Sequence, residues 1–266
     1  MNEEKFSEEF DKNGVILIKG CINKEIMSKV REQYELLNEK VTRTEIEKEK
    51  PIIVLWRHVV GDQKRLTNFD EFPSLYQLIE KSIVPVLREK FPKKFKRLQL
   101  LETIIFNKPA NISNTLNWHQ DVSYFPLKPN NQVAVWIPFD YVDKERSAMV
   151  YALGSHKSGI MGSTNLHTRE KFQNEDRPLI PENPADAGYE VKCMEMDSED
   201  MLVHDGYTWH YTGPNTVDGY TRRGLSVRFI VDEAVFDPRP GQGAAFTKQI
   251  NVKPGDVVQG PAFPLM

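Results

Sequence analysis

The sequence has very little cysteine and no long apolar run. Cys21 and Cys193 are its only cysteines, too few for a disulfide-held scaffold and typical of two reduced thiols. No apolar stretch approaches the roughly 18 residues that a membrane-spanning helix needs. The opening MNEEKFSEEF lacks the basic and apolar regions of a secretory signal, and the closing GPAFPLM matches no common addressing or lipidation signal. We therefore expect a cytoplasmic protein with no membrane attachment.

An excess of charge of one sign is also missing. The 266 residues include 35 basic and 38 acidic ones, a formal net charge of -3. No basic face with interleaved aromatic residues is present, which argues against nucleic acid as a partner. Hydrophobic residues make up 39% of the chain, enough for a sizeable core in a single domain over residues 1–266. The composition does not indicate an oligomeric state.

Residues 1–95 are expected to form a mainly helical support region. Asn23 is placed to cap a helix that continues to about residue 38, because apolar residues recur there at helical spacing. A second helix is expected over residues 72–91. Pro85 should kink or break this helix, because proline removes a backbone donor and clashes with the preceding turn.

Three further segments complete this region. Residues 14–20, GVILIKG, are a short apolar run between glycines and predict a strand. Residues 51–60, PIIVLWRHVV, predict a second, buried strand. The charged residues 39–50 predict an exposed link before it.

From residue 97 to residue 232 the sequence is typical of short β-strands. Runs rich in β-branched and aromatic residues alternate with Pro, Asn and Gly, which favours antiparallel strands joined by turns. This pattern predicts a mainly β fold with flanking helices, namely a double-stranded β-helix (a cupin-like jelly roll) whose mouth is a natural ligand site. The eight expected strands lie at residues 97–107, 116–125, 132–142, 147–153, 189–196, 200–206, 208–213 and 222–232.

A long polar segment, residues 155–187, interrupts these strands. It contains several prolines and is too long for an ordinary hairpin connection. Segments of this length in a compact domain are usually active-site covers or disordered, and we expect a lid. After the last strand, the prolines of residues 233–266 predict an irregular tail on the surface.

The clearest chemical pattern is the stretch WHQD, which contains His119 and Asp121. Side chains two residues apart in an extended strand point the same way, so this imidazole and this carboxylate can face one ion. His210, in a later strand, is the best candidate for a third ligand, and His204 is the alternative. Two histidines and one carboxylate on one side of a metal are the ligand set that suits non-haem Fe(II) oxygenases.

Two adjacent arginines, Arg222 and Arg223, open the strand that follows His210. Arginine binds a carboxylate through two parallel charge-assisted hydrogen bonds, so an arginine near an iron site implies a co-substrate that carries a carboxylate. Because side chains alternate along a strand, the two arginines cannot both face one pocket. Either could be the carboxylate-binding residue.

Four segments together resemble the signature segments of the phytanoyl-CoA dioxygenase family of Fe(II)- and 2-oxoglutarate-dependent oxygenases. They are NKPA, HQDVSYFPLKP, VWIPFDYVDKERSAMVYALGSHKSG and HYTGPNTVDGYTRRGLSVRF. The resemblance covers residues 100–231 well and the N-terminal helices loosely. It implies an enzyme that uses Fe(II), 2-oxoglutarate and O2.

The resemblance also implies roles for individual residues. In the family both ends of the HxD motif bind iron, here His119 and Asp121, and the distal ligand opens an H-x-S/T-G-x-N segment, here at His210. The arginine that binds 2-oxoglutarate precedes a small-hydrophobic-serine step, which fits Arg222, with Arg223 as the alternative if the loop is longer by one residue. The other co-substrate residues implied are Thr212, Trp136 and Ser226.

The resemblance further implies that succinate and CO2 form while a small-molecule substrate is oxidised. Halogenating relatives carry a small residue in place of the motif aspartate, so Asp121 implies hydroxylation or another oxygen-driven oxidation. An acyl-CoA and a natural-product scaffold both remain candidate substrates, because the fold alone does not choose between them. Charges in such a segment are usually only solvated, but four cations there could meet an anionic group such as a CoA phosphate, namely Lys157, Arg169, Lys171 and Arg177.

Two other functional classes stay open. A non-catalytic binding protein could keep the jelly roll and the metal, although the intact triad and arginine argue against it. A cupin-like isomerase or hydrolase would use the metal without 2-oxoglutarate and would not need the arginine. Hydroxylation of an aliphatic carbon is the favoured interpretation.

Overall fold

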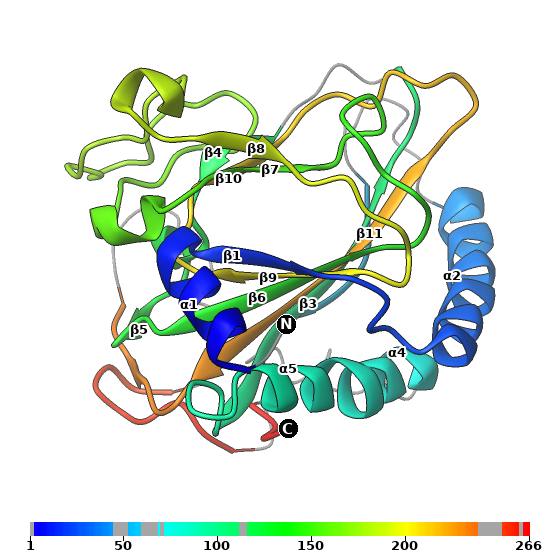
Figure 1. Cartoon of the computed structure of the whole chain (residues 1–266), viewed down its shortest axis with the longest axis horizontal. Coiled ribbons are helices and arrows are strands. Elements are labelled where there is room, and N and C mark those ends of the chain that lie inside the picture. Colours follow the sequence, from blue (N-terminus) through cyan, green and yellow to red (C-terminus); the bar gives the residue numbers. More distant parts are fainter. Residues whose placement is uncertain are drawn as a thin grey trace.

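Two antiparallel β-sheets face each other, and helices cover the outer side of the larger sheet (Figure 1). The computed structural model describes residues 3–44, 53–59, 69, 72–111, 116–238, 252–260 and 263–266, with backbone alone for 40–44 and 53–59. The helical elements are α1 (Glu3–Asn13), α2 (Lys24–Thr44), α4 (Pro73–Leu78), a π-helical turn (Ile79–Ile83) and α5 (Val84–Lys90), with short 3-10 helices at Asp121–Tyr124, Ser155–Ser158 and Pro184–Ala187. The strands are β1 (Val15–Ile18), β2 (Ile53–Val59), β3 (Leu98–Lys108), β4 (Leu116–His119), β5 (Leu127–Lys128), β6 (Gln132–Pro138), β7 (Met149–Ala152), β8 (Val191–Cys193), β9 (Met201–Asp205), β10 (His210–Thr212), β11 (Arg222–Val231) and β12 (Val235–Phe236).

The larger sheet has the order β1-β9-β6-β11-β3-β2, so two strands of the N-terminal region join the jelly roll. Side chains on its central strand β11 alternate between two environments. Leu225 and Val227 belong to the apolar core that includes the helices, whereas Arg222, Ser226 and Arg228 line a cavity on the opposite face. The period of two therefore places one face of the strand in the core and the other between the sheets.

Helix α1 was not among the expected elements. Its Phe6 and Phe10 lie four residues apart, on one face of the helix, and both make edge contacts with Phe91 after α5, at ring-centroid distances of 6.3 and 5.4 Å. This pair is the helical signal in an otherwise charged stretch. Within the described residues, no helix has both the length and the apolar character needed to cross a membrane.

Helix α2 begins where expected and ends later. The backbone N–H of Ile26 donates to Oδ1 of Asn23 at 3.0 Å, so the predicted N-cap is confirmed. The helix continues to Thr44, so the expectation of a link from residue 39 is wrong for residues 39–44. The rest of that expected link, residues 45–50, lies outside the described residues, as do positions 51, 52 and 60 of the expected strand.

The helix expected over residues 72–91 is irregular near Pro85. The chain passes from α4 into the π-helical turn, and α5 restarts at Val84 with Pro85 as its second residue. Proline has no N–H to donate to the preceding turn, and the wider π turn accommodates its ring at the start of the new helix. The predicted disturbance near Pro85 is confirmed, and it takes the form of a π-helical turn within a continuous helix rather than a break.

The smaller sheet has the order β4-β10-β7-β8. His210 at the start of β10 lies opposite His119 of β4 on one side and Tyr151 of β7 on the other. Apolar side chains such as Met149 and Leu202 fill the space between the two sheets. The short smaller sheet thus carries both histidines on adjacent strands.

Strand β4 ends at His119, and Asp121 opens a 3-10 helix, Asp121–Tyr124. The expectation of a strand over residues 116–125 is therefore wrong beyond His119. Gln120 nevertheless keeps extended backbone angles, φ -124° and ψ 144°. The two-residue alternation therefore still applies between His119 and Asp121.

The segment 155–187 lies against the smaller sheet and the connection after β4. The Gln120 side chain donates from Nε2 to the Gly159 carbonyl at 3.1 Å and accepts from the Met161 N–H at 2.6 Å. Met161 and Ile180 pack in an apolar cluster with Trp209. The segment is thus bonded next to the expected metal ligands, and its opening as a lid stays a prediction.

The C-terminal tail is less irregular than expected. Its strand β12 pairs with β5, and Val258 and Phe263 are buried in a cluster with Leu101 and Phe236. Prolines therefore limit regular structure in the described part of the tail without keeping it away from the core.

Replacing Asn23 by Ala should lower the free energy of unfolding by about 1 kcal/mol, because the first turn of α2 loses its side-chain acceptor. Urea denaturation followed by circular dichroism measures the difference. Asn23→Ser is the matched control, since serine also caps helices. An equal loss in both variants would show that the cap is not the cause.

Candidate metal centre and adjoining cavity

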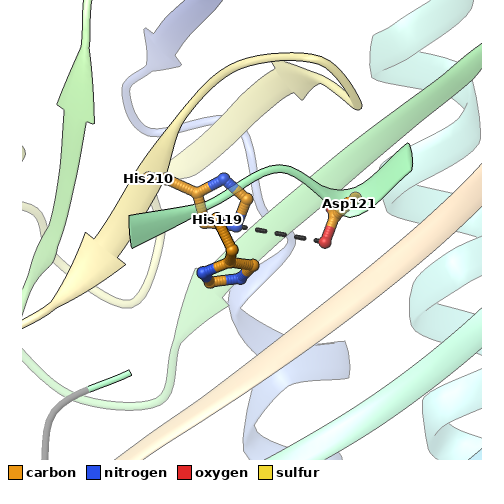
Figure 2. Close-up of side chains that lie close together, drawn as sticks. All are labelled: His119, Asp121 and His210. Atoms are coloured by element: carbon orange, nitrogen blue, oxygen red, sulfur yellow. Dashed lines mark ion pairs between the residues drawn. The ribbon is translucent and has the colours of Figure 1, made fainter. Parts of the chain in front are cut away.

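Three buried side chains converge where β4 and β10 meet. His119 ends β4, Asp121 opens the 3-10 helix after it, and His210 opens β10 (Figure 2). One ligand atom from each residue lies within 4.8 Å of those of the other two. Such a group of two imidazoles and one carboxylate is suited to one metal ion.

Both imidazoles are oriented by backbone carbonyls. Nδ1 of His119 lies 2.7 Å from the Asn117 carbonyl oxygen, and Nδ1 of His210 lies 2.9 Å from that of Thr208. A carbonyl only accepts, so Nδ1 carries the proton in each ring and Nε2 keeps its lone pair. Burial lowers the pKa of both histidines, which maintains the neutral form that binds metals.

The Asp121 carboxylate has a donor on each oxygen. Arg228 donates from a terminal nitrogen to Oδ1 at 2.8 Å, and His204 Nε2 lies 3.2 Å from Oδ2. Burial by itself would raise the pKa of Asp121, but Arg228 and the neighbouring histidines hold it well below its usual value. The carboxylate is therefore ionised and fixed in orientation.

His204 is placed behind the carboxylate and outside the converging group. Its Nε2 donates to Asp121, so its Nδ1 is the acceptor for the Tyr151 hydroxyl, 3.0 Å away. Arg228 is likewise anchored, because its other terminal nitrogen donates to Glu102 at 2.7 Å. The alternative of His204 as third ligand thus gains no geometric support.

A cavity adjoins the triad and contains every residue that the family resemblance assigned to the co-substrate. Its apolar wall comes from Phe106, Leu116 and Met149. Its polar lining includes Trp136, Thr212, Arg222, Ser226, His119 and His210. The strands β6, β10 and β11 thus bring the expected residues together beside the metal ligands.

The two adjacent arginines point to opposite faces of β11. Arg222 is buried in the cavity wall, with its Nε donating to the Ser147 carbonyl at 3.2 Å and its guanidinium carbon 5.2 Å from the centre of a Trp136 ring. Arg223 lies on the outer face, where it binds Asp140 and Glu35. Arg222 is therefore the arginine available to a molecule in the cavity.

Two donor groups at this end of the cavity keep unused hydrogen-bonding capacity within the described chain. The buried Thr212 hydroxyl has no hydrogen-bond partner among the described residues. Among the described residues, the Arg222 guanidinium donates a hydrogen bond to the Ser147 carbonyl alone, and burial lowers the pKa of Arg222 to about 10. Unsatisfied buried donors and an unneutralised cation favour an anionic acceptor here.

Gly224 allows the Trp136 indole to lie against β11. A Cβ at this position would be 2.7 Å from Cζ2 of Trp136, closer than two carbons normally approach. The two residues are on adjacent strands, and the indole therefore occupies the space that a side chain would fill. Glycine is required here for close packing rather than for an unusual backbone angle.

Sequence reasoning missed the groups around Asp121. Arg228 lies six residues after Arg222 on the same strand, and even spacing places both on one face. That period was a usable signal for a second inward-facing arginine. The partnerships of Arg228 with Glu102 and of His204 with Tyr151 depend on strand order and register, which single-sequence patterns do not contain.

The four cations considered for a CoA phosphate mostly have other partners. Arg177 pairs with Glu175 at 2.5 Å and Arg169 with Glu182 at 3.5 Å. Lys157 donates to a backbone carbonyl of α1. The segment 155–187 therefore gives no support to a phosphate-binding patch built from these side chains.

The fold and the buried triad define a jelly-roll protein with a His-Asp-His group suited to a metal ion. The family model for phytanoyl-CoA dioxygenase (PhyH) matches residues 10–224, and the chain belongs to this family. Peroxisomal phytanoyl-CoA dioxygenase from Mus musculus is 22% identical over 249 residues, covering 86% of this chain and 68% of the mouse protein.

Two solved structures share the fold over nearly the whole chain. The first is SnoK, a non-haem α-ketoglutarate-dependent carbocyclase from nogalamycin biosynthesis, with a TM-score of 0.72 and 19% identity over 100% of this chain and 98% of SnoK. The second is the epimerase SnoN in complex with Fe3+, α-ketoglutarate and nogalamycin RO, with a TM-score of 0.73 and 17% identity over 99% and 98%. These likenesses confirm the expected fold class.

Replacing Gly224 by Val should displace the Trp136 indole and lower the free energy of unfolding by about 1–3 kcal/mol, as overpacking does in well-filled interiors. Near-ultraviolet circular dichroism and urea denaturation measure the two effects. Gly213→Ala is the control, because a Cβ at Gly213 has no atom within 4 Å. An unchanged tryptophan signal in Gly224→Val would contradict the close approach.

Proposed function

We propose that the protein is an Fe(II)- and 2-oxoglutarate-dependent oxygenase that hydroxylates an aliphatic carbon of a small-molecule or lipid-derived substrate. The observation that carries this proposal is the placement of a buried His119, Asp121 and His210 group beside a cavity that ends in Arg222, which has no carboxylate partner within the described chain. Membership of the phytanoyl-CoA dioxygenase family supports the same class.

The three proposed ligands fit Fe(II) chemically. Two neutral imidazoles and one ionised carboxylate leave one positive charge on a divalent ion, and their position on one side leaves other sites open. Nδ1 of each histidine is already bonded to a backbone carbonyl, so metal binding at Nε2 requires no change of tautomer. SnoN, which shares the fold, is described in complex with Fe3+ and α-ketoglutarate.

The cavity residues fit 2-oxoglutarate. Arg222 offers a buried guanidinium to a carboxylate, and the Thr212 hydroxyl offers a donor without a partner. Ser226 adds a hydroxyl to the lining, and Trp136 packs against Arg222 and restricts its orientation. We assign these four residues to the co-substrate.

In this proposal, bound iron supplies the reaction of O2 with 2-oxoglutarate that yields succinate and CO2 and oxidises the substrate. The protein's own residues position and shield the reactants. Asp121 is kept ionised and oriented by Arg228 and His204, while the apolar wall of Phe106, Leu116 and Met149 limits water. Asp121 also argues against halogenation, because it fills the position that halide would need.

Hydroxylation is the most specific part of the proposal. SnoK is described as a carbocyclase and SnoN as an epimerase, so product analysis should include cyclised and epimerised compounds. Either an acyl-CoA or a natural-product scaffold is the proposed substrate class. The cytoplasm is the proposed compartment, to be checked by fractionation because the mouse relative is described as peroxisomal.

Anaerobic addition of Fe(II) and then 2-oxoglutarate to the metal-free protein should produce the weak visible charge-transfer band of the iron chelate, saturating near one equivalent. Arg222→Ala should weaken 2-oxoglutarate binding by about 2–5 kcal/mol, because a buried charged contact is lost. Arg223→Ala is the matched control and should bind normally, since that side chain lies on the outer face. Iron binding without the band in the unaltered protein would favour a metal-only enzyme or a binding protein.

Alanine at His119, Asp121 or His210 should each abolish stoichiometric Fe(II) binding, because two remaining ligands hold the ion poorly. His204→Ala should still bind one equivalent at high iron concentration, with an affinity lower by about 10–100-fold through the weaker support of Asp121. Equilibrium dialysis with metal analysis gives both quantities. Full retention by His210→Ala together with loss in His204→Ala would reverse the assignment.

A further inference from the structure

A second buried cation stands beside Arg222. Lys108 ends β3 directly opposite Arg222 of β11 in the sheet register, and its side chain is fully buried. Its ammonium nitrogen donates to the Ser147 hydroxyl at 2.9 Å and to the Gly213 carbonyl oxygen. Arg222 donates to the carbonyl of the same Ser147. The two cations therefore lie side by side, and both hydrogen-bond to Ser147 in the loop before β7.

Neither cation has a carboxylate partner within the described chain. The other arginines of β11 differ in this respect, because Arg228 pairs with Asp121 and Glu102 and Arg223 with Asp140 and Glu35. Two adjacent buried positive charges without a counter-charge are unfavourable in a low-dielectric interior. Lysine relieves this by losing its proton, whereas arginine does not.

We propose that a dicarboxylate co-substrate binding at Arg222 causes Lys108 to take up one proton, so that the empty site holds a single positive charge and the loaded site holds two. The inference rests on the proposed function, because it needs a carboxylate in the cavity. Lys108 acts as a positioning residue through Arg222 and Ser147, and the proton comes from the buffer.

The surroundings of Lys108 support this charge change. Burial, and then the field of Arg222, lower the pKa of Lys108 to about 7. The two loops that contact its amine provide Ser147 and Gly213, which do not titrate. These loops also carry Asp140, Tyr141, Asp143, Lys144, Glu145, Arg146, Asp218 and Tyr220. Within the described chain, Arg222 is the one charged group whose field shifts the pKa of Lys108. Of the two buried cations, Lys108 is therefore the one that can lose its proton near neutral pH.

The sign of the pH dependence follows directly. A bound carboxylate offsets the charge of Arg222, so the pKa of Lys108 is higher in the loaded protein than in the empty one. Well below pH 7 the amine is protonated in both states, and binding takes up no proton. Above pH 7 the empty site loses its proton, so uptake approaches one and affinity falls by up to about tenfold per pH unit.

Isothermal titration calorimetry tests this with the Zn(II)-loaded protein and 2-oxoglutarate, in buffers of different ionisation enthalpy at about pH 6 and about pH 8. The unaltered protein should take up nearly no proton at the lower pH and close to one at the higher. Lys108→Arg should bind with no uptake at either pH, because its guanidinium stays charged. Lys192→Met, on the exposed strand β8, is the control and should behave like the unaltered protein.

Each outcome distinguishes the inference from the proposed function. Binding without proton uptake in the unaltered protein, or uptake undiminished in Lys108→Arg, would overturn the role of Lys108 and leave the oxygenase proposal intact. Absence of 2-oxoglutarate binding altogether would overturn both. Lys108→Met, with folding checked by circular dichroism, should bind more weakly at pH 6 than the unaltered protein and show no uptake. Unchanged affinity in that variant would count against a charge on Lys108 in the loaded site.

Discussion

The bridge that Arg228 makes between Asp121 and Glu102 is the interaction on which the candidate metal centre depends. Asp121 leaves its strand for a 3-10 helix, so the strand pairing that orients His119 no longer orients the carboxylate. The Arg228 guanidinium, from β11 of the larger sheet, orients the Asp121 carboxylate instead. The ion pair between Arg228 and Asp121 thus joins the two sheets beside the candidate metal centre. A metal ion there would meet a carboxylate that is already ionised and oriented.

Three arginines on one strand have three different electrostatic environments. Arg228 is buried and neutralised, Arg223 is paired at the outer surface, and Arg222 is buried with a lysine as its charged neighbour. Alternation along β11 separates Arg223 from the other two, and the pairing with β3 places Glu102 beside one and Lys108 beside the other. The cavity is therefore positive at one end and balanced at the other, which orients an asymmetric anion.

Much of the fold and of the candidate site follows from local patterns. The β-rich texture after residue 97, the Asn23 cap and the helical irregularity near Pro85 depend on neighbours in sequence, and the structure agrees with each. The convergence of His119 and Asp121 required only a two-residue extended spacing. Arg222 could not be chosen over Arg223 from spacing alone, because the choice depends on which face of β11 meets the helices.

The missed features depend on contacts between distant segments. No local pattern indicates that His204 accepts a hydrogen bond from the Tyr151 hydroxyl and donates one to Asp121. These residues come together only through the order of the strands. The length of α2 was missed for a different reason. Its last two turns are charged, and a charged stretch does not by itself indicate a loop, because lysine, arginine and glutamate form helices well.

The Gln120 amide, between two proposed ligands, is bonded on both its oxygen and its nitrogen. Ser123 and Met161 donate to the oxygen, and the nitrogen donates to Gly159 and Tyr207. The Gln120 side chain therefore links the backbone at Gly159 and Met161 to the segment that carries His119 and Asp121. Natural variation in length within residues 155–187 should accordingly concentrate in the largely exposed stretch after residue 167, where added residues leave the ligand geometry undisturbed.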